Sequence, residues 1–413
     1  MSIHTDAKTI LETALRACRP DEAVRRALEG RAFSKGRIVL VAAGKAAWQM
    51  AYCAAQVLGE RLSEGVVVTK YGHGMGPIAR CHIYEGGHPV PDENSFRGTE
   101  AAMALVKDLT GEDTVVFLLS GGGSALFESP LIPGAELAEL TEAMLASGAD
   151  IVEMNTVRKR LSAVKGGRFA RLCAPAQVFA VVLSDILGDP LDMIASGPAC
   201  PDASTCADAF AVAEKYRLPL SPQARQLLSV ETPKQLDNVE TVITGSVREL
   251  CAAAAGACRE LGYRPVLLTD RLCCEAREAG SFLSSIARTH DEDGESLAFL
   301  AGGETVVHLT GSGLGGRNQE LALAAAPGID GMADTVIFSV GSDGTDGPTD
   351  AAGGMVDGMT MERLRRAGLS VHRVLADNDA YHALDAVGGL IRTGPTGTNV
   401  NDVAVVLLRR DRR

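Results

Sequence analysis

Two basic side chains each stand directly after a glycine-bearing turn. Lys45 follows the apolar run Ile38–Ala42, and Arg317 follows a pair of glycines. A cation beside free backbone N–H groups at the start of a helix suits a phosphate or a carboxylate. An exposed lysine at an ordinary turn is an equal interpretation of Lys45. The Walker phosphate loop is excluded, because Val39 and Ala46 stand where it needs Gly and Ser or Thr.

A run of three glycines between two serines is the stronger anion-binding signal. It follows the apolar run Thr114–Leu119. Glycines let the backbone approach a ligand closely, and the serines add hydroxyl donors. We favour anion binding over a flexible connector. The residues are Ser120, Gly121, Gly122, Gly123 and Ser124.

Two acidic loops also follow apolar runs. Asp185 and Asp189 come after Val178–Leu183, and Asp343 and Asp346 come after Thr335–Val340. Carboxylates at such places could hold Mg²⁺ through water and phosphate oxygens, or accept a proton. Ordinary turn chemistry explains them as well. The second loop superficially resembles a calcium-binding EF-hand loop but lacks that loop's ligand positions and its final Glu.

Three further segments carry candidate ligand-binding groups. The basic stretch 155–171 reads as a helix with a largely solvated charged face, from which Arg158 could neutralise an anion. The loop 394–399 offers Thr396 and Asn399 to a polar ligand, or forms an ordinary turn. The segment 311–316 contains GxGxxG, which on its own is weak evidence for a dinucleotide.

The elements that position these loops alternate between apolar runs and helical patterns. The runs show little alternation, which predicts strands covered on both faces in parallel sheets. We expect an α/β protein with two domains, an N-terminal Rossmann-like domain over residues 1–236 and a smaller C-terminal α/β domain over 237–413. Residues 305–309 are expected to form a hairpin with the strand before them. The loops should meet in a cleft between the domains.

Composition limits the possible functions. The net charge of -12 disfavours nucleic-acid binding. The first 20 residues predict an amphipathic helix rather than a signal peptide, and the uncharged stretches are too short to span a bilayer. A cytoplasmic protein with no membrane partner is expected. The 10 cysteines contain no CxxC pair and are expected to be reduced thiols.

Taken together, the motifs resemble the class II glycerate 2-kinase family, also called the MOFRL family. They occur in a consistent order over nearly the whole chain. The matching segments are 43–46, 87–92, 119–125, 154–159, 183–185, 195–198, 302–305, 315–320 and 342–350.

The resemblance implies phosphorylation of D-glycerate at its 2-hydroxyl, with ATP and Mg²⁺ as cofactors and the active site between two domains. It implies catalytic roles for Lys45 and Arg317. It adds Gly197, Glu304 and Asn318 to the candidate binding residues. Glycerate and ATP are then the partners, and the protein is expected to be a monomer or a homodimer.

Phosphoryl transfer depends on positioning and on neutralising oxygens. We therefore expect Lys45 and Arg317 to brace the transferring group. Asp185 and Asp189, or Asp343 and Asp346, would hold Mg²⁺ or accept the hydroxyl proton, with Asp185 as the catalytic candidate. One rival is an NAD(P)H-dependent hydroxypyruvate reductase using the 311–316 loop. The other is a non-catalytic sensor of sugar acids or phosphometabolites.

Overall fold

The computed structural model describes residues 2–410 and contains two compact units. The N-terminal unit comprises Ala23–Thr244. The C-terminal unit comprises Gly245–Arg413 together with Met1–Glu22. This division differs from the expected one at residues 236 and 237 in two respects. The first 22 residues belong with the C-terminal unit, and residues 237–244 belong with the N-terminal unit.

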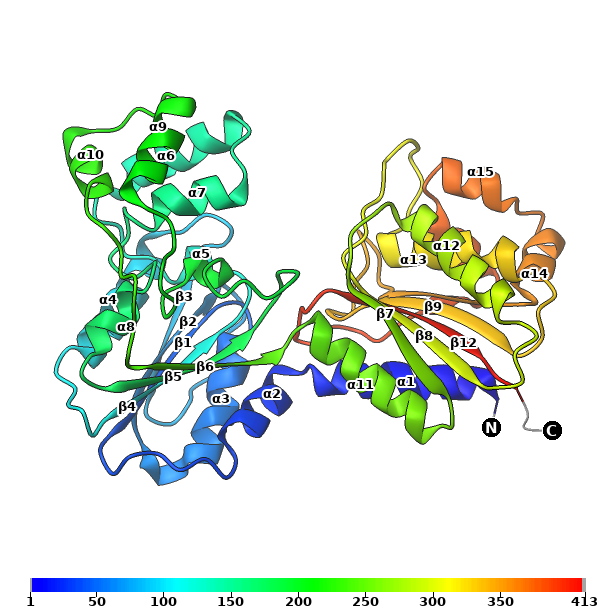
Figure 1. Cartoon of the computed structure of the whole chain (residues 1–413), viewed down its shortest axis with the longest axis horizontal. Helices are drawn as coiled ribbons and strands as arrows, with labels where there is room; N and C mark the ends of the chain where they lie inside the picture. The colour runs from blue at the N-terminus through cyan, green and yellow to red at the C-terminus, as the bar shows by residue number, and fades with distance from the viewer. Residues whose placement is uncertain (1, 411–413) are drawn as a thin grey trace. The chain divides into compact units, whose positions relative to one another are not determined.

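A six-stranded sheet forms the centre of the N-terminal unit, in the order β3-β2-β1-β4-β5-β6 (Figure 1). β1 pairs in parallel with β2 and β4, β2 with β3, and β4 with β5. This is the strand order of Rossmann-type folds, so the expected α/β class is confirmed. The strands are β1 (Ile38–Ala43), β2 (Leu62–Lys70), β3 (Cys81–Gly86), β4 (Thr114–Leu119), β5 (Gln177–Leu183) and β6 (Val239–Gly245).

Helices cover both faces of this sheet, which explains why β1 is apolar at every position and β4 at every position after Thr114. All residues of both strands are buried. α3 lies on one face, and α4 and α8 lie on the other. The helices are α2 (Pro20–Leu28), α3 (Ala47–Leu58), α4 (Glu93–Val106), α5 (Gly123–Leu126), α6 (Gly134–Ala146), α7 (Ile151–Arg158), α8 (Arg168–Cys173), α9 (Cys206–Lys215) and α10 (Pro222–Leu228).

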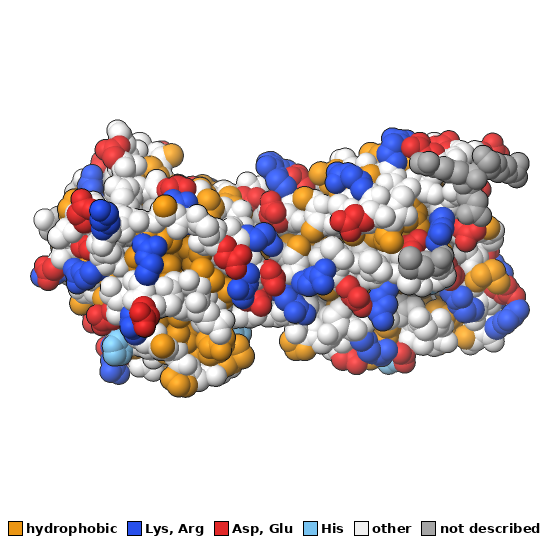
Figure 2. Space-filling view, turned by 90° about the horizontal axis from the view of Figure 1, so that it is seen from below, with side chains coloured by type: hydrophobic (Ala, Val, Ile, Leu, Met, Phe, Trp, Pro, Cys, Tyr) orange, Lys and Arg blue, Asp and Glu red, His pale blue; other side chains and the backbone are white. Residues whose placement is uncertain are grey.

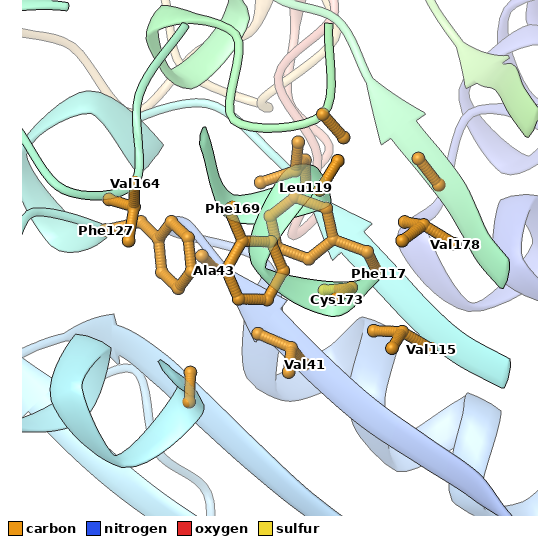
Figure 3. Packing of buried hydrophobic residues seen from close by; sticks show 14 of the residues in the cluster. Val41, Ala43, Val115, Phe117, Leu119, Phe127, Val164, Phe169, Cys173 and Val178 are labelled. Carbon is orange, nitrogen blue, oxygen red and sulfur yellow. The ribbon is translucent and has the colours of Figure 1, made fainter. Parts of the chain in front are cut away.

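Three phenylalanine rings form the core beneath the ends of β1 and β4 (Figure 3). The ring centroids of Phe117 and Phe169 are 4.7 Å apart, and those of Phe127 and Phe169 are 5.0 Å apart in an edge-to-face contact. Phe127 is the C-cap residue of α5. The core therefore anchors the segment that follows the three glycines.

The sheet of the C-terminal unit is mixed, in the order β11-β10-β9-β12-β8-β7. β12 is antiparallel to β8 and β9, whereas β7 and β8 are parallel. Residues 305–309 form no hairpin strand, contrary to expectation, because β12 takes the place beside β8. The strands are β7 (Arg264–Leu272), β8 (Leu297–Gly303), β9 (Thr335–Gly341), β10 (Gly353–Asp357), β11 (Leu390–Ile391) and β12 (Asp402–Leu408).

Helices also lie on both faces of the second sheet, with α1 and α11 on one and α12 and α13 on the other (Figure 1). α1 is the expected amphipathic helix, and its buried Asp6 fixes it to this unit. Asp6 Oδ2 accepts hydrogen bonds from Tyr263 Oη at 2.8 Å and from Arg409 Nη1 at 3.0 Å. The helices are α1 (Ile3–Ala17), α11 (Val247–Glu260), α12 (Ala276–Thr289), α13 (Arg317–Ala325), α14 (Thr360–Arg366), α15 (Val371–Ala376) and α16 (Ala380–Ala386).

The surface mixes charges of both signs. In the view of Figure 2, Lys and Arg side chains alternate with Asp and Glu over the visible face. None of the ten cysteines forms a disulfide. Within residues 2–410, no helix is both long and apolar enough to cross a bilayer.

Candidate active site

The loops that follow β1 and β4 lie side by side at the point where the strand order of the first sheet reverses. Ligands of open α/β sheets bind at this point. The Lys45 amide donates to the Gly121 carbonyl at 2.9 Å, and the Ala46 amide donates to Ser120 Oγ at 3.1 Å. Gly44, at φ +124°, passes so close that a Cβ there would lie 2.3 Å from Ser120 Oγ. Only glycine allows the two loops to join in this way.

The resulting loop pair presents hydrogen-bond donors that have no acceptor. Among residues 2–410, nothing accepts from the amides of Gly121, Gly122 or Ser124, and the Lys45 ammonium has no ion-pair partner. Unfilled backbone amides beside a lysine form a binding site for an anion. The structure thus favours the anion-binding interpretation of both loops over an exposed turn and a flexible connector.

Two further side chains approach the glycines. A Cβ on Gly122 would lie 3.0 Å from His88 Cδ2 and 3.1 Å from Lys45 Cγ, and one on Gly121 would lie 2.1 Å from Asp185 Oδ2. Burial lowers the pKa of His88, and the charge of Lys45 lowers it further. A neutral imidazole and a carboxylate therefore flank the anion site. His88 was not among the predicted site residues, although its Gly-His-Pro context is a signal that sequence analysis can find.

The Asp185–Asp189 loop fits a magnesium ion better than the other acidic loop does. Asp189 Oδ1 is buried and has no hydrogen-bond partner among the described residues, and Asp189 adopts a left-handed φ of +53°. Within residues 2–410, no group of three or more His, Cys, Asp or Glu is arranged to hold a metal. Mg²⁺ does not require one, since it takes one or two carboxylates together with waters and substrate phosphates.

The basic stretch 155–171 is not the single solvated helix that was expected. α7 ends at Arg158, and α8 begins only at Arg168. Lys159, Arg160 and Lys165 are all at most 3% exposed. They are buried because carboxylates distant in the sequence pair with them, which no local pattern reveals.

Two of the predicted binding residues lie near the triglycine loop. Arg158 Nη2 donates to the Ser124 carbonyl at 3.2 Å. The Ser124 hydroxyl lies 3.2 Å from that of Ser196, next to the buried Gly197 at φ +66°. A Cβ on Gly197 would approach the backbone of Asp192 to 3.1 Å. Gly197 therefore permits a tight turn behind the loop.

Arg317 heads α13 in the C-terminal unit, where two carboxylates hold its guanidinium. Nε and Nη2 contact the two carboxylate oxygens of Asp402 at 2.5 and 2.9 Å, and Nη1 lies 3.2 Å from Glu304 Oε1. Burial opposes protonation of Arg317, but the two carboxylates raise its pKa. The second N–H of each Nη remains for an anion. Asp402 was not predicted, because nothing before β12 marks it as the partner of Arg317.

The Asp346 carboxylate accepts hydrogen bonds from backbone amides at the N-terminal end of α13. Its Oδ1 accepts from the Asn318 amide at 3.1 Å, and its Oδ2 accepts from the Gln319 amide at 2.9 Å. Burial raises the pKa of Asp346 to about 6, against these hydrogen bonds. Asn318 is also buried and accepts from Ser339 Oγ at 2.6 Å. Both residues are thus engaged in holding the helix end, which favours positioning roles over metal or substrate contact.

The remaining predicted residues lie in two loops that touch. The Thr396 amide donates to the Asp343 carbonyl at 3.2 Å, and Thr396 Oγ1 donates to the Ser342 carbonyl at 2.5 Å. Asp343 Oδ1 accepts from the Thr345 amide at 2.9 Å. Asn399 is exposed nearby along the chain. Each unit thus assembles its own share of the predicted residues.

Comparison with known proteins extends this picture to the whole chain. Residues 6–229 match the family described as "Domain of unknown function (DUF4147)", and residues 297–402 match the MOFRL family. The chain is 51% identical to a D-glycerate 2-kinase of Thermotoga maritima, with 97% of each chain covered. The chain belongs to the glycerate 2-kinase family. It is also 38% identical to a glycerate 2-kinase of Pyrococcus horikoshii, over 100% of this chain and 99% of that one.

Solved structures of the glycerate 2-kinase family share the fold. A crystal structure of glycerate kinase from Thermotoga maritima superimposes with a TM-score of 0.93 at 50% identity, covering 98% of this chain and 99% of that one. Some relatives carry another name. A protein of Agrobacterium vitis that is 40% identical, over 97% of this chain and 93% of its own length, is called a putative hydroxypyruvate reductase.

In this member of the glycerate 2-kinase family, backbone amides of the GxGxxG segment already donate hydrogen bonds to side chains of the same chain. Asn378 Oδ1 accepts from the Gly311 amide at 2.9 Å, and the carboxylates of Asp377 and Asp379 accept from the amides of Ser312 and Leu314. In a dinucleotide fold these amides face the pyrophosphate. Here an incoming pyrophosphate would meet two carboxylates instead. The segment therefore fits a structural turn and not a dinucleotide site.

Proposed function

We propose that this protein transfers the terminal phosphoryl group of ATP to the 2-hydroxyl of D-glycerate. The observation that carries the proposal is the set of amides at Gly121, Gly122 and Ser124, which have no acceptor among residues 2–410, beside Lys45, which has no ion-pair partner among the same residues. Such a set suits an oxyanion of a phosphate or of the glycerate carboxylate. Membership of the glycerate 2-kinase family selects glycerate among hydroxy acids.

In this proposal, the two basic side chains neutralise charge during phosphoryl transfer. Lys45 and the triglycine loop neutralise oxygens from the N-terminal unit, and Arg317 does so from the C-terminal unit. Phosphoryl transfer has little covalent chemistry for the protein to perform, so most of the rate enhancement comes from positioning and from cations that neutralise charge. The Asp402 carboxylate holds Arg317 at two points, which keeps the guanidinium ready before substrate arrives.

The acidic loop after β5 supplies the remaining functions. Asp185 and Asp189 would hold Mg²⁺, which when bound neutralises phosphate charge. Asp185 is also the candidate acceptor for the proton of the 2-hydroxyl. We also propose that Thr396 and Asn399 contact substrate or nucleotide, that the protein works in the cytoplasm where ATP is supplied, and that it is a monomer or a homodimer.

A coupled assay of ADP release over a panel of hydroxy acids tests the proposal. D-glycerate should give the highest kcat/KM, and enolase should consume the product because it accepts 2-phosphoglycerate but not the 3-isomer. Lys45→Ala and Arg317→Ala should each lower kcat by roughly 100-fold. Lys107→Ala, at an exposed lysine, is the control. Near wild-type turnover in both site variants would refute the assigned roles.

The same assay separates the rivals. NADH oxidation by hydroxypyruvate without ATP would support a reductase, and calorimetric binding of glycerate without any turnover would support a sensor. Neither result is expected.

A further inference from the structure

Lys165 is fully buried directly beneath the triglycine loop. Its Nζ lies 3.2 Å from Glu128 Oε2, and both side chains have 0% exposure. The same Nζ donates to the carbonyl oxygens of Ser124 at 2.7 Å and Phe127 at 3.1 Å. A buried ion pair costs desolvation free energy that packed apolar residues would not. The pair therefore needs an explanation beyond stability.

The two carbonyls that Lys165 holds belong to the turn that continues the loop. Ser124 is the last residue of the glycine-rich segment, and Phe127 is the C-cap residue of α5 and lies in the phenylalanine core (Figure 3). The ammonium thus links the main chain of the loop to that core.

Other groups hold Ser124 as well. Arg158 Nη2 donates to the same carbonyl at 3.2 Å. The Ser124 hydroxyl lies 3.2 Å from Ser196 Oγ, which donates to Asn155 Oδ1 at 2.8 Å. Ser124 is therefore held at its main chain by two cations and at its side chain by a hydrogen-bonded chain. Such a network fixes one loop conformation.

We propose that Lys165 is a positioning residue for phosphoryl transfer, which holds the Gly121–Ser124 amides in the geometry that binds the anion. The inference rests on the proposed kinase function. Lys165 does not touch substrate and acts only through the loop. Burial lowers the pKa of Lys165 to about 8. The charge of Glu128 raises this pKa and that of Arg158 lowers it, and at about 8 the ammonium is still mostly charged at pH 7.

Three variants of the full-length protein test the proposal. Lys165→Met removes the ammonium but leaves the Glu128 carboxylate buried alone, so this variant can fail to fold. Lys165→Met/Glu128→Gln removes both charges and keeps the fold testable. Lys159→Met is the matched control, because Lys159 is also buried and paired, with Asp202 at 3.2 Å and Asp192 at 3.3 Å, and its ammonium has no hydrogen bond to the triglycine loop within residues 2–410.

Two readouts distinguish positioning from a purely structural role. In the double variant, kcat should fall at least roughly tenfold while KM for glycerate changes by less than about threefold, because the geometry matters most in the transition state. Hydrogen exchange of the peptide 120–127 should become faster. Lys159→Met should lower the melting temperature without either change.

Two results would contradict the positioning role or the proposed function. A double variant with wild-type kcat and wild-type exchange at 120–127 would overturn the proposal. If the wild-type protein transfers no phosphoryl group to glycerate, the proposed function fails. In that case unchanged exchange in the double variant still refutes the positioning role, and faster exchange confined to 120–127 still supports it.

Discussion

Arg317 and Asp402 form a two-point ion pair, with 2.5 Å between Nε and Oδ2 and 2.9 Å between Nη2 and Oδ1. The carboxylate side chain is only 8% exposed, whereas the guanidinium is 34% exposed. Burial raises the pKa of Asp402, and the hydrogen bonds from Arg317 counter it. The buried partner thus orients an accessible cation.

This pair predicts that lysine cannot replace Arg317. An ammonium is a point charge and cannot form the two parallel bonds that the planar guanidinium makes. Arg317→Lys should therefore lower kcat by roughly 30–100-fold in the ADP-release assay. Arg363→Lys, at another arginine that pairs with an aspartate in the same unit, should leave kcat unchanged. Equal kcat in both variants would show that the two parallel bonds of the Arg317 guanidinium do not matter for activity.

Gly122→Ala should impair activity more than stability. The residue has φ +83°, and the new methyl group would meet His88 and Lys45 at 3.0 and 3.1 Å. Gly148→Ala is the control, since Gly148 has φ +76° but nothing within 4 Å. Both changes should cost about 1 kcal/mol of stability from backbone strain. Only Gly122→Ala should reduce kcat/KM for glycerate, and a similar loss in Gly148→Ala would contradict the site assignment.

Asp346 predicts a dependence of stability on pH. Its pKa is about 6 in the folded protein, against 3.8 for the ordinary group. The folded state therefore binds the proton more tightly, and this contribution to stability is complete below pH 4 and is lost as pH rises through 6. Wild-type protein should lose about 2–3 kcal/mol relative to Asp346→Asn between pH 4 and 7. Urea unfolding at several pH values measures this, and a constant difference would refute it.

Removing a ring from the phenylalanine core should leave a cavity that lowers the free energy of unfolding. Phe127→Ala should lower the free energy of unfolding by about 3–5 kcal/mol, because the ring is fully buried against Phe117 and Phe169. Phe282→Ala, at a ring that is 62% exposed, should change it by less than about 0.5 kcal/mol. Urea unfolding compares the two. A small effect at Phe127 would mean that the turn after the glycines is not anchored by this core.

Much of the fold follows from local signals. The apolar runs at β1, β4, β5 and β9 predicted those strands, and the turns and acidic loops that follow them supplied the candidate site residues. β6 lies within residues 237–413, which were assigned to the second domain. Only pairing with β5 places it in the first sheet, and pairing is a tertiary property.

The site was less accessible to prediction for the same reason. Lys165 and Lys159 look like solvated cations in a helical stretch, because their carboxylate partners Glu128 and Asp202 lie 37 and 43 residues away. Asp402 is the first residue of β12 and belongs to no motif. Charges that are buried in pairs cannot be recognised from one member alone.

The attachment of α1 to the C-terminal unit has a consequence for synthesis on the ribosome. Asp6 and Arg409 are 403 positions apart, yet they share a partly buried hydrogen bond. In topological terms, Ala23–Thr244 is an insertion within the other unit. The inserted unit can fold while translation continues. α1 is synthesised before the inserted unit, whereas its partner Arg409 is synthesised after that unit, so the C-terminal unit can complete its fold only after the inserted unit has been made.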